Sequence, residues 1–316
     1  MNPSVDTCVI GSGYGGLSIA RALDVAGADY VVLDKGRTPG GRAATRRFSG
    51  SRFDHGLPLL TDQGPLSWEL IERGCRGGVL DRLDPAEAGC EGWFAKAGIS
   101  ALGKHLASDL NVRNQVRVTR VREADGGLIL ETDEAGQTGM VEVRRELHVT
   151  APLPQAMELV APLDPDWDLP EGSPFHKAVV AMVKPDPGLL PDGPFFRPLE
   201  SGKGSLVLEN LKFPDVEPGV SLRFSPDESE RIFDLGDDAT FEIVSGELEP
   251  LTGPVPSDRI QLMRWRYANG SGLVPVPFLE TTSGRVRVTV CGDAFFGGTA
   301  SGVEASLMSC RAALIH

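Results

Sequence analysis

The chain has 316 residues, of which 41% are hydrophobic and 24% are charged, and its formal net charge is −13 at pH 7. This length suits two domains or one large domain. So negative a chain is unsuited to binding nucleic acid, and no apolar run approaches the roughly 20 residues of a membrane helix. We therefore expect neither a nucleic acid nor a membrane as a partner.

The five cysteines form no CxxC pair and show no metal-ligand spacing; they are Cys8, Cys75, Cys90, Cys291 and Cys310. This pattern predicts free thiols in a reducing compartment and no metal site. The chain runs directly into a strand pattern without a signal segment, so we expect a cytoplasmic protein. The oligomeric state is left open.

A glycine-rich turn follows the first predicted strand. Gly11, Gly13 and Gly16 lie between that strand and a helix pattern that ends near Gly27, and a second strand pattern from residue 30 ends in Asp34. This order is the dinucleotide-binding fingerprint. The first glycine permits the turn, the second lets a pyrophosphate approach the backbone, and the third lets the helix pack against the strand. We assign ribose binding to Asp34, and we expect further contacts from Tyr14, Gly15 and Lys35.

The next segments alternate between loops, helices and strands. Residues 36–62 read as a loop rich in glycine and arginine, which indicates a nearby anion or, alternatively, a solvated basic loop. Helices are predicted over 64–75, 98–106 and 152–160, a hairpin over 116–132, and a strand over 146–150. Residues 162–260 are rich in proline and short strand patterns, which predicts a mainly antiparallel inserted domain. A strand over 285–290, a turn at Gly292-Asp293 and a helix over 302–314 close the chain.

Two short motifs resemble those of flavoproteins of the amine-oxidase type. Gly40, Gly41 and Arg42 follow soon after the ribose-binding acid, and Gly292-Asp293 ends a late strand. The resemblance implies FAD: Arg42 neutralises the pyrophosphate, Asp293 holds the ribityl region, and the final helix directs its N-terminus at the flavin. It also implies contacts from the following residues: Gly56, Val116, Gly302 and Val303.

Longer stretches resemble the renalase family. They are 40–47 (GGRAATRR), 53–56 (FDHG), 98–106 (GISALGKHL), 265–268 (WRYA) and 303–306 (VEAS). This resemblance implies an FAD enzyme that oxidises the 1,2- and 1,6-dihydro isomers of NAD(P), with oxygen as the likely electron acceptor and a small molecule as its partner. No cysteine lies between residues 90 and 291, so the FAD is expected to be non-covalent.

The predicted fold is α/β: a Rossmann-type FAD-binding domain of the amine-oxidase/glutathione-reductase type, with an inserted α+β substrate domain built on an antiparallel sheet. We assign 1–62, 98–161 and 283–316 to the FAD-binding domain. Residues 63–97 and 162–282 are assigned to the substrate domain.

The chain departs from the renalase pattern beside the expected flavin. Residues 57–60 (LPLL) replace a segment that is usually AQYF, Ala294-Phe295 replaces a Trp-Cys pair, and 296–301 is longer than usual. Two alternatives therefore stay open. One is an amine oxidase or another flavin oxidoreductase whose more apolar substrate contacts Leu57, Leu59, Leu60, Phe295 and Phe296. The other is a non-catalytic FAD-fold binding protein.

The candidates for lining the flavin are His55, Pro58, Trp265 and Tyr267. Strand alternation places Trp265 and Tyr267 on one face and Arg264 and Arg266 on the other. That aromatic face serves either the active site or packing between domains. For His55 a purely structural role is the competing interpretation. We expect structural roles for His105 and His148.

Overall fold

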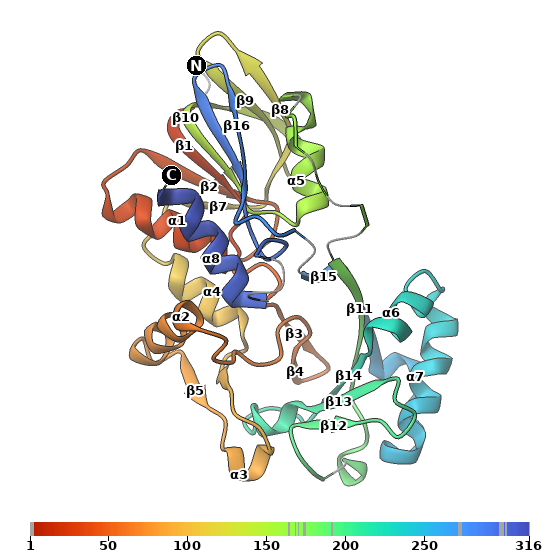
Figure 1. The fold of residues 1–316 in the computed structure, drawn as a ribbon. Coiled ribbons are helices and arrows are strands. Elements are labelled where there is room, and N and C mark those ends of the chain that lie inside the picture. The colour runs from red at the N-terminus through yellow and green to blue at the C-terminus, as the bar shows by residue number, and fades with distance from the viewer. Residues whose placement is uncertain are drawn as a thin grey trace.

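The computed structural model describes residues 3–163, 165–167, 169, 171–172, 175–190, 192–270, 274–296, 300 and 302–315. Figure 1 shows a large sheet with flanking helices in the upper part of the molecule and a smaller sheet with its own helices at the lower right. Strands β11 (Phe175–Val183) and β15 (Ile260–Gly270) lie at the junction between the two parts.

The first sheet has eight strands, in the order β16-β17-β10-β1-β2-β7, with β8 and β9 attached through β10. They are β1 (Ser4–Ile10), β2 (Tyr30–Asp34), β7 (Val112–Asn114), β8 (Val116–Ala124), β9 (Gly127–Glu134), β10 (Gln137–Val149), β16 (Leu279–Ser283) and β17 (Val286–Val290). The pairs β1–β2, β1–β10, β10–β17 and β2–β7 are parallel. The predicted hairpin over 116–132 is confirmed as the antiparallel pair β8–β9.

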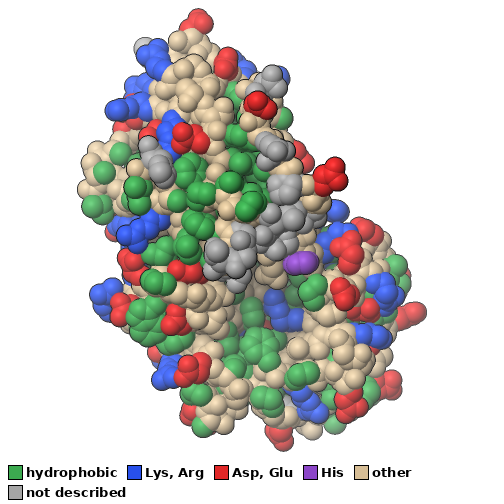
Figure 2. Space-filling view, in the orientation of Figure 1, with side chains coloured by type: hydrophobic (Ala, Val, Ile, Leu, Met, Phe, Trp, Pro, Cys, Tyr) green, Lys and Arg blue, Asp and Glu red, His purple; other side chains and the backbone are tan. Residues whose placement is uncertain are grey.

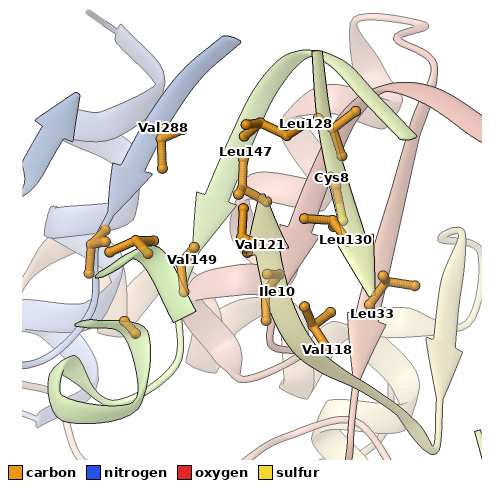
Figure 3. Close-up of a cluster of buried hydrophobic side chains, with 14 of the residues drawn as sticks. Cys8, Ile10, Leu33, Val118, Val121, Leu128, Leu130, Leu147, Val149 and Val288 are labelled. Atoms are coloured by element: carbon orange, nitrogen blue, oxygen red, sulfur yellow. The ribbon is translucent and has the colours of Figure 1, made fainter. Parts of the chain in front are cut away.

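Both faces of the parallel strands are covered, as the apolar character of these strands requires. Successive residues of β1 point to opposite faces, so Cys8 and Ile10 join one buried cluster and Val9 joins another. Figure 3 shows the first cluster, in which side chains from the parallel strands meet Val118 and Val121 of β8. Helices α1 (Tyr14–Val25) and α8 (Gly302–Ile315) cover the opposite face, where they share the second cluster with Val9.

The second sheet is antiparallel and has five strands, in the order β12-β13-β14-β11-β15. Besides β11 and β15 it contains β12 (Phe196–Pro198), β13 (Gly204–Leu208) and β14 (Val220–Phe224). Helices α6 (Pro226–Ile232) and α7 (Asp237–Thr252) pack on it through a shared apolar cluster. The combination of a Rossmann-type sheet and an antiparallel sheet confirms the predicted fold class.

The other helices lie mostly around the first sheet. They are α1 (Tyr14–Val25), α2 (Pro65–Arg76), α3 (Pro85–Ala88), α4 (Ser100–Ala107), α5 (Leu153–Val160) and α8 (Gly302–Ile315), with short 3-10 turns at Ala161–Leu163, Pro187–Leu189, Glu209–Leu211 and Ser257–Arg259. Gly27 has φ +65° just after α1, as a helix-terminating glycine does. None of the helices in the described ranges is both long and apolar enough to cross a membrane.

Two small hairpins complete the fold. The pair β5 (Leu80–Arg82) and β6 (Trp93–Ala95) extends from α2. The pair β3 (Thr45–Phe48) and β4 (Ser51–Asp54) lies inside residues 36–62, so the prediction of a continuous loop there was wrong. Each of these strands has four residues and only one apolar side chain, so neither shows the alternation that predicts a strand.

The predicted domain boundaries stay a prediction, but two elements pack with a different part of the molecule from the one to which they were assigned. Strand β16 begins at Leu279 and pairs with β17 in the first sheet, although the boundary was set at residue 283. Helix α2 shares a buried cluster with Tyr14 of α1 and Leu102 of α4, although 63–97 was assigned to the substrate domain.

Candidate cofactor and substrate site

The glycine turn has the geometry that its sequence predicts. Gly11 has φ +108°, a conformation that side-chain-bearing residues rarely adopt. A Cβ on Gly16 would lie 2.0 Å from the carbonyl oxygen of Gly11, so only glycine lets α1 come this close to β1. On Gly15 a Cβ would lie 2.6 Å from the Ser306 hydroxyl, so Gly15 lets α8 approach α1.

The same turn is open at Gly13. Among the described residues, a Cβ on Gly13 would meet no atom within 4 Å, and no side chain caps the start of α1. The first N–H groups of a helix have no partner within the helix and carry its positive dipole end. This end of α1 is therefore suited to a phosphate. The Tyr14 side chain is buried in the α1–α2–α4 cluster, which leaves its backbone to contact a ligand.

Asp34 is held at the end of β2 by neighbours that the sequence analysis did not single out. One carboxylate oxygen accepts hydrogen bonds from the backbone N–H and hydroxyl of Ser12, at 2.6 and 2.8 Å. The other accepts from the Gly36 N–H at 2.6 Å. Gly36 in turn accepts a hydrogen bond from the Gln115 N–H, which places Val116 nearby with its side chain buried. The exposed Lys35 side chain takes no part in this arrangement around Asp34 and donates to Gln155 instead.

The Gly40–Arg42 segment joins the glycine turn to the end of the chain. The Gly40 N–H donates to the Ser12 carbonyl at 2.8 Å, and a Cβ on Gly41 would lie 3.2 Å from the Gly13 Cα. The Arg42 guanidinium donates to both carboxylate oxygens of Asp293, at 2.6 and 2.9 Å. It also donates to the carbonyls of residues 267 and 268 in β15. Arg42 and Asp293 thus neutralise each other here.

The start of α8 is tied to the start of α2 by reciprocal side-chain contacts. The Gln63 side-chain oxygen accepts from the N–H groups of Val303 and Glu304, at 3.2 and 3.3 Å. The Glu304 carboxylate accepts from the N–H groups of residues 66 and 67. Gly292 has φ +150° and open space where a Cβ would be. Gly302, with φ +56°, lies beside Gln63.

His55 follows β4 and lies beside Trp265 of β15. Its ring stacks on the indole with centroids 5.5 Å apart and planes 16° apart, and the indole N–H donates to the His55 carbonyl at 3.0 Å. The residue is 5% exposed, and its Nδ1 has no hydrogen-bond partner among the described residues. Burial, with the positive charge of Arg46 as a smaller cause, lowers the pKa of His55 to about 4. The ring is therefore neutral at pH 7.

The two faces of β15 separate as strand alternation predicts. Arg264 donates to Asp237 at 2.6 Å, and the Arg266 guanidinium lies over the Phe233 ring, so both arginines face α6 and α7. Trp265 faces His55 instead, and the half-buried Tyr267 contacts Phe175 edge-to-face. Figure 2 shows the surface hollowed between the two parts of the molecule, with hydrophobic and basic side chains inside the hollow.

Three of the residues proposed to make the substrate site apolar belong to the protein core. Leu59, Leu60 and Phe295 are 4%, 1% and 1% exposed and pack in three different buried clusters. These side chains stand where the sequence comparison expected residues beside the flavin. They fill the protein core and do not form an apolar surface for a substrate. Leu57 and Phe296 are half-buried. Of the longer stretch after Phe296, residues 297–299 and 301 lie outside the described residues.

Comparisons with known proteins identify the fold. Residues 9–73 match the family described as NAD(P)-binding Rossmann-like domain. The lycopene-forming phytoene desaturase of Pseudescherichia vulneris is 45% identical over 81 residues, which cover 26% of this chain and 16% of that enzyme. The chain thus matches only a small part of this curated relative.

Solved structures match the whole chain at low identity. Cyclohexylamine oxidase from Brevibacterium oxydans IH-35A aligns with a TM-score of 0.63 at 12% identity, over 99% of this chain and 98% of that one. A putrescine oxidase bound to putrescine aligns with a TM-score of 0.56 at 13% identity, over 100% and 99% of the two chains. The chain therefore has the two-part fold of amine oxidase structures.

Proposed function

We propose that the chain is an FAD-dependent oxidoreductase. The observation that carries this proposal is a continuous series of contacts from Asp34 through Ser12 and Gly40 to the Arg42–Asp293 pair. A site for adenosine diphosphate alone needs only the first part of this series. The second part joins the glycine turn to the two segments that resemble flavin-binding motifs.

The residues present fit the cofactor. The open turn at Gly13 and the uncapped start of α1 suit the pyrophosphate, and Asp34 suits the ribose. Arg42 and Asp293 would then hold the pyrophosphate and ribityl region. Cys291 is fully buried, in keeping with non-covalent binding. When bound, FAD supplies a hydride acceptor at flavin N5.

We take the side chains of residues 54–58 and of β15 to orient the substrate and exclude water. Hydride transfer depends on orientation more than on an acid or a base. Neutral His55 offers one N–H donor and one acceptor nitrogen to a polar substrate. Trp265 holds the His55 carbonyl and ring, so it fixes the direction of those polar groups.

The specific reaction that we propose is oxidation of 1,2- or 1,6-dihydro-NAD(P), with oxygen as the acceptor. It rests on the renalase-like motifs, which are far apart in sequence but contact one another: the motif with Arg42 donates to the backbone of 267–268, and the motif with His55 stacks on Trp265.

The test is anaerobic reduction of the FAD-loaded protein. Addition of 1,6-dihydro-NADP should bleach the visible flavin absorbance, and oxygen should restore it with formation of hydrogen peroxide. The ordinary 1,4-dihydro isomer is the matched control, because it differs only in the position of the reactive hydrogens. A flavin that stays oxidised with both aberrant isomers excludes this reaction.

A second candidate is oxidation of an amine or another apolar substrate. It is favoured by Tyr267 and Phe296, two half-buried aromatic side chains packed at the margin of the same cluster. Reduction by members of an amine panel, and not by dihydronicotinamides, would select it. Binding of FAD without turnover of any reductant would instead favour a non-catalytic binding protein.

A further inference from the structure

The backbone of residues 54–58, which carries two of the candidate substrate-side residues, is held by side chains from the second sheet and its connections. Four carbonyls in this segment accept a side-chain hydrogen bond. The donors are Arg223 to Asp54 O (3.4 Å) and Gly56 O (2.6 Å), Trp265 to His55 O (3.0 Å), and Lys212 to Pro58 O (3.0 Å).

The N–H groups of the same segment point to the cofactor motif. Gly56 donates to the Ala44 carbonyl at 3.4 Å, and Leu57 donates to the Arg42 carbonyl at 3.0 Å. A Cβ on Gly56 would lie 1.7 Å from the Arg42 carbonyl oxygen, so the two backbones are in direct contact. The segment therefore connects Arg42 on one side to the second sheet on the other.

Lys212 is a fully buried cation within this arrangement. Its side chain is 0% exposed, and its ammonium lies 2.8 Å from carboxylate oxygens of both Asp54 and Glu209. The rings of Phe195 and Phe213 flank it at 5.4 and 4.9 Å. Burial acts to lower the pKa of Lys212, but the two carboxylates outweigh it and raise that pKa above the ordinary value.

A buried network of this kind is a poor source of stability, because desolvation of the charges offsets most of their attraction. It does impose one geometry, since each buried donor must reach its acceptor. We propose that Lys212 and Arg223 are positioning residues that hold the 54–58 backbone, and with it His55 and Pro58, in place for the substrate. This proposal rests on the proposed function, because it takes this segment to face the reacting groups.

Variants must remove the contacts while keeping equal numbers of buried positive and negative charges. The network contains two carboxylates, Asp54 and Glu209, and two cations, Lys212 and Arg223. The double substitution Glu209→Gln/Lys212→Met keeps one charge of each sign and removes the donor to the Pro58 carbonyl. The second variant, Glu209→Gln/Arg223→Met, also keeps one charge of each sign and removes the donors to the carbonyls of residues 54 and 56. It is used if the first variant does not fold.

The surface offers a matched control. Lys203 and Glu247 form an ion pair at 2.6 Å in which the lysine side chain is 45% exposed. Lys203→Met/Glu247→Gln makes the same chemical changes away from the 54–58 segment.

The first readout is the titration of His55, followed by NMR of isotope-labelled histidine rings and assigned with His55→Gln. In the wild type, His55 should not titrate between pH 6 and 8, since its pKa is about 4. Displacement of the segment exposes the ring, so in either network variant the signal should titrate near its ordinary pKa of about 6.5. The surface control should behave as the wild type. This readout needs no activity, so it decides the structural part even if the proposed reaction is wrong.

The second readout is the rate of flavin reduction. Misplacement of substrate-side groups should lower the maximal rate, measured on FAD-saturated protein, by at least about tenfold. The surface control should be as active as the wild type. An unchanged His55 titration in a folded network variant overturns the proposal. A shifted titration with an unchanged rate also overturns it, because the segment then moves without affecting the reaction. A wild type that oxidises no substrate refutes the proposed function instead.

Discussion

The contrast between two open glycines tests where the cofactor phosphates bind. Gly13 and Gly236 are the N-cap residues of α1 and α7, with φ,ψ of −66°,174° and −62°,159°. A Cβ on either residue would meet no atom within 4 Å in the part of the chain that the structure describes, and both conformations suit alanine. Substitution by alanine is therefore sterically free at both sites in the protein alone.

The two alanine variants should lose a small and similar amount of unfolding free energy. Loss of a glycine N-cap costs a few tenths of a kcal/mol to about 1 kcal/mol, and the lower entropy of the unfolded alanine chain returns about 0.4–1 kcal/mol. Thermal unfolding without added FAD should show both variants within about 2–4 °C of the wild type.

Cofactor affinity should separate the two variants. In Gly13→Ala the new methyl group occupies the space open to the pyrophosphate and keeps it from the N–H groups of α1. Loss of such charge-assisted hydrogen bonds costs about 1.5–3 kcal/mol, which raises the Kd for FAD by about 10- to 100-fold. Calorimetric titration of the apoprotein measures this Kd. An unchanged Kd in folded Gly13→Ala would refute binding of the phosphates at this turn, and Gly236→Ala should bind as the wild type does.

Three further substitutions or conditions give distinct expectations. Gly16→Ala places a Cβ 2.0 Å from the backbone oxygen of Gly11, so urea unfolding should show a loss of about 2–4 kcal/mol; an unchanged midpoint contradicts the close approach. Arg42→Met leaves the buried Asp293 carboxylate without its cation, which should cost about 3 kcal/mol; adding Asp293→Asn should restore much of it, and additive effects in that double-mutant cycle would contradict the pairing. Because the pKa of His55 falls from 6.5 to about 4 on folding, its stabilising contribution is complete above pH 6.5 and declines as pH falls toward 4. Between pH 7 and 5.5 the wild type should lose about 1 kcal/mol more unfolding free energy than His55→Gln, and equal pH dependence would show that the ring is not buried.

The parts of the site that depend on local backbone geometry could be predicted from the amino-acid sequence. Gly11 is needed because its backbone has a positive φ, and Gly16 is needed because the helix there touches the end of the first strand. The alternation of Trp265 and Arg264 also follows from a local rule, since successive residues of a strand face opposite ways. These features could be predicted because few residues, close in the chain, decide them.

Contacts between side chains that are distant in the chain could not be predicted in this way. Arg42 and Asp293 are 251 positions apart and form a bidentate pair, and no local pattern marks Lys212 as a fully buried cation. Leu60 was expected beside the flavin because the renalase pattern has a flavin-side residue at that position. It packs in the core instead. Burial and pairing depend on how the two sheets are placed against each other, and that placement is set by packing over the whole chain.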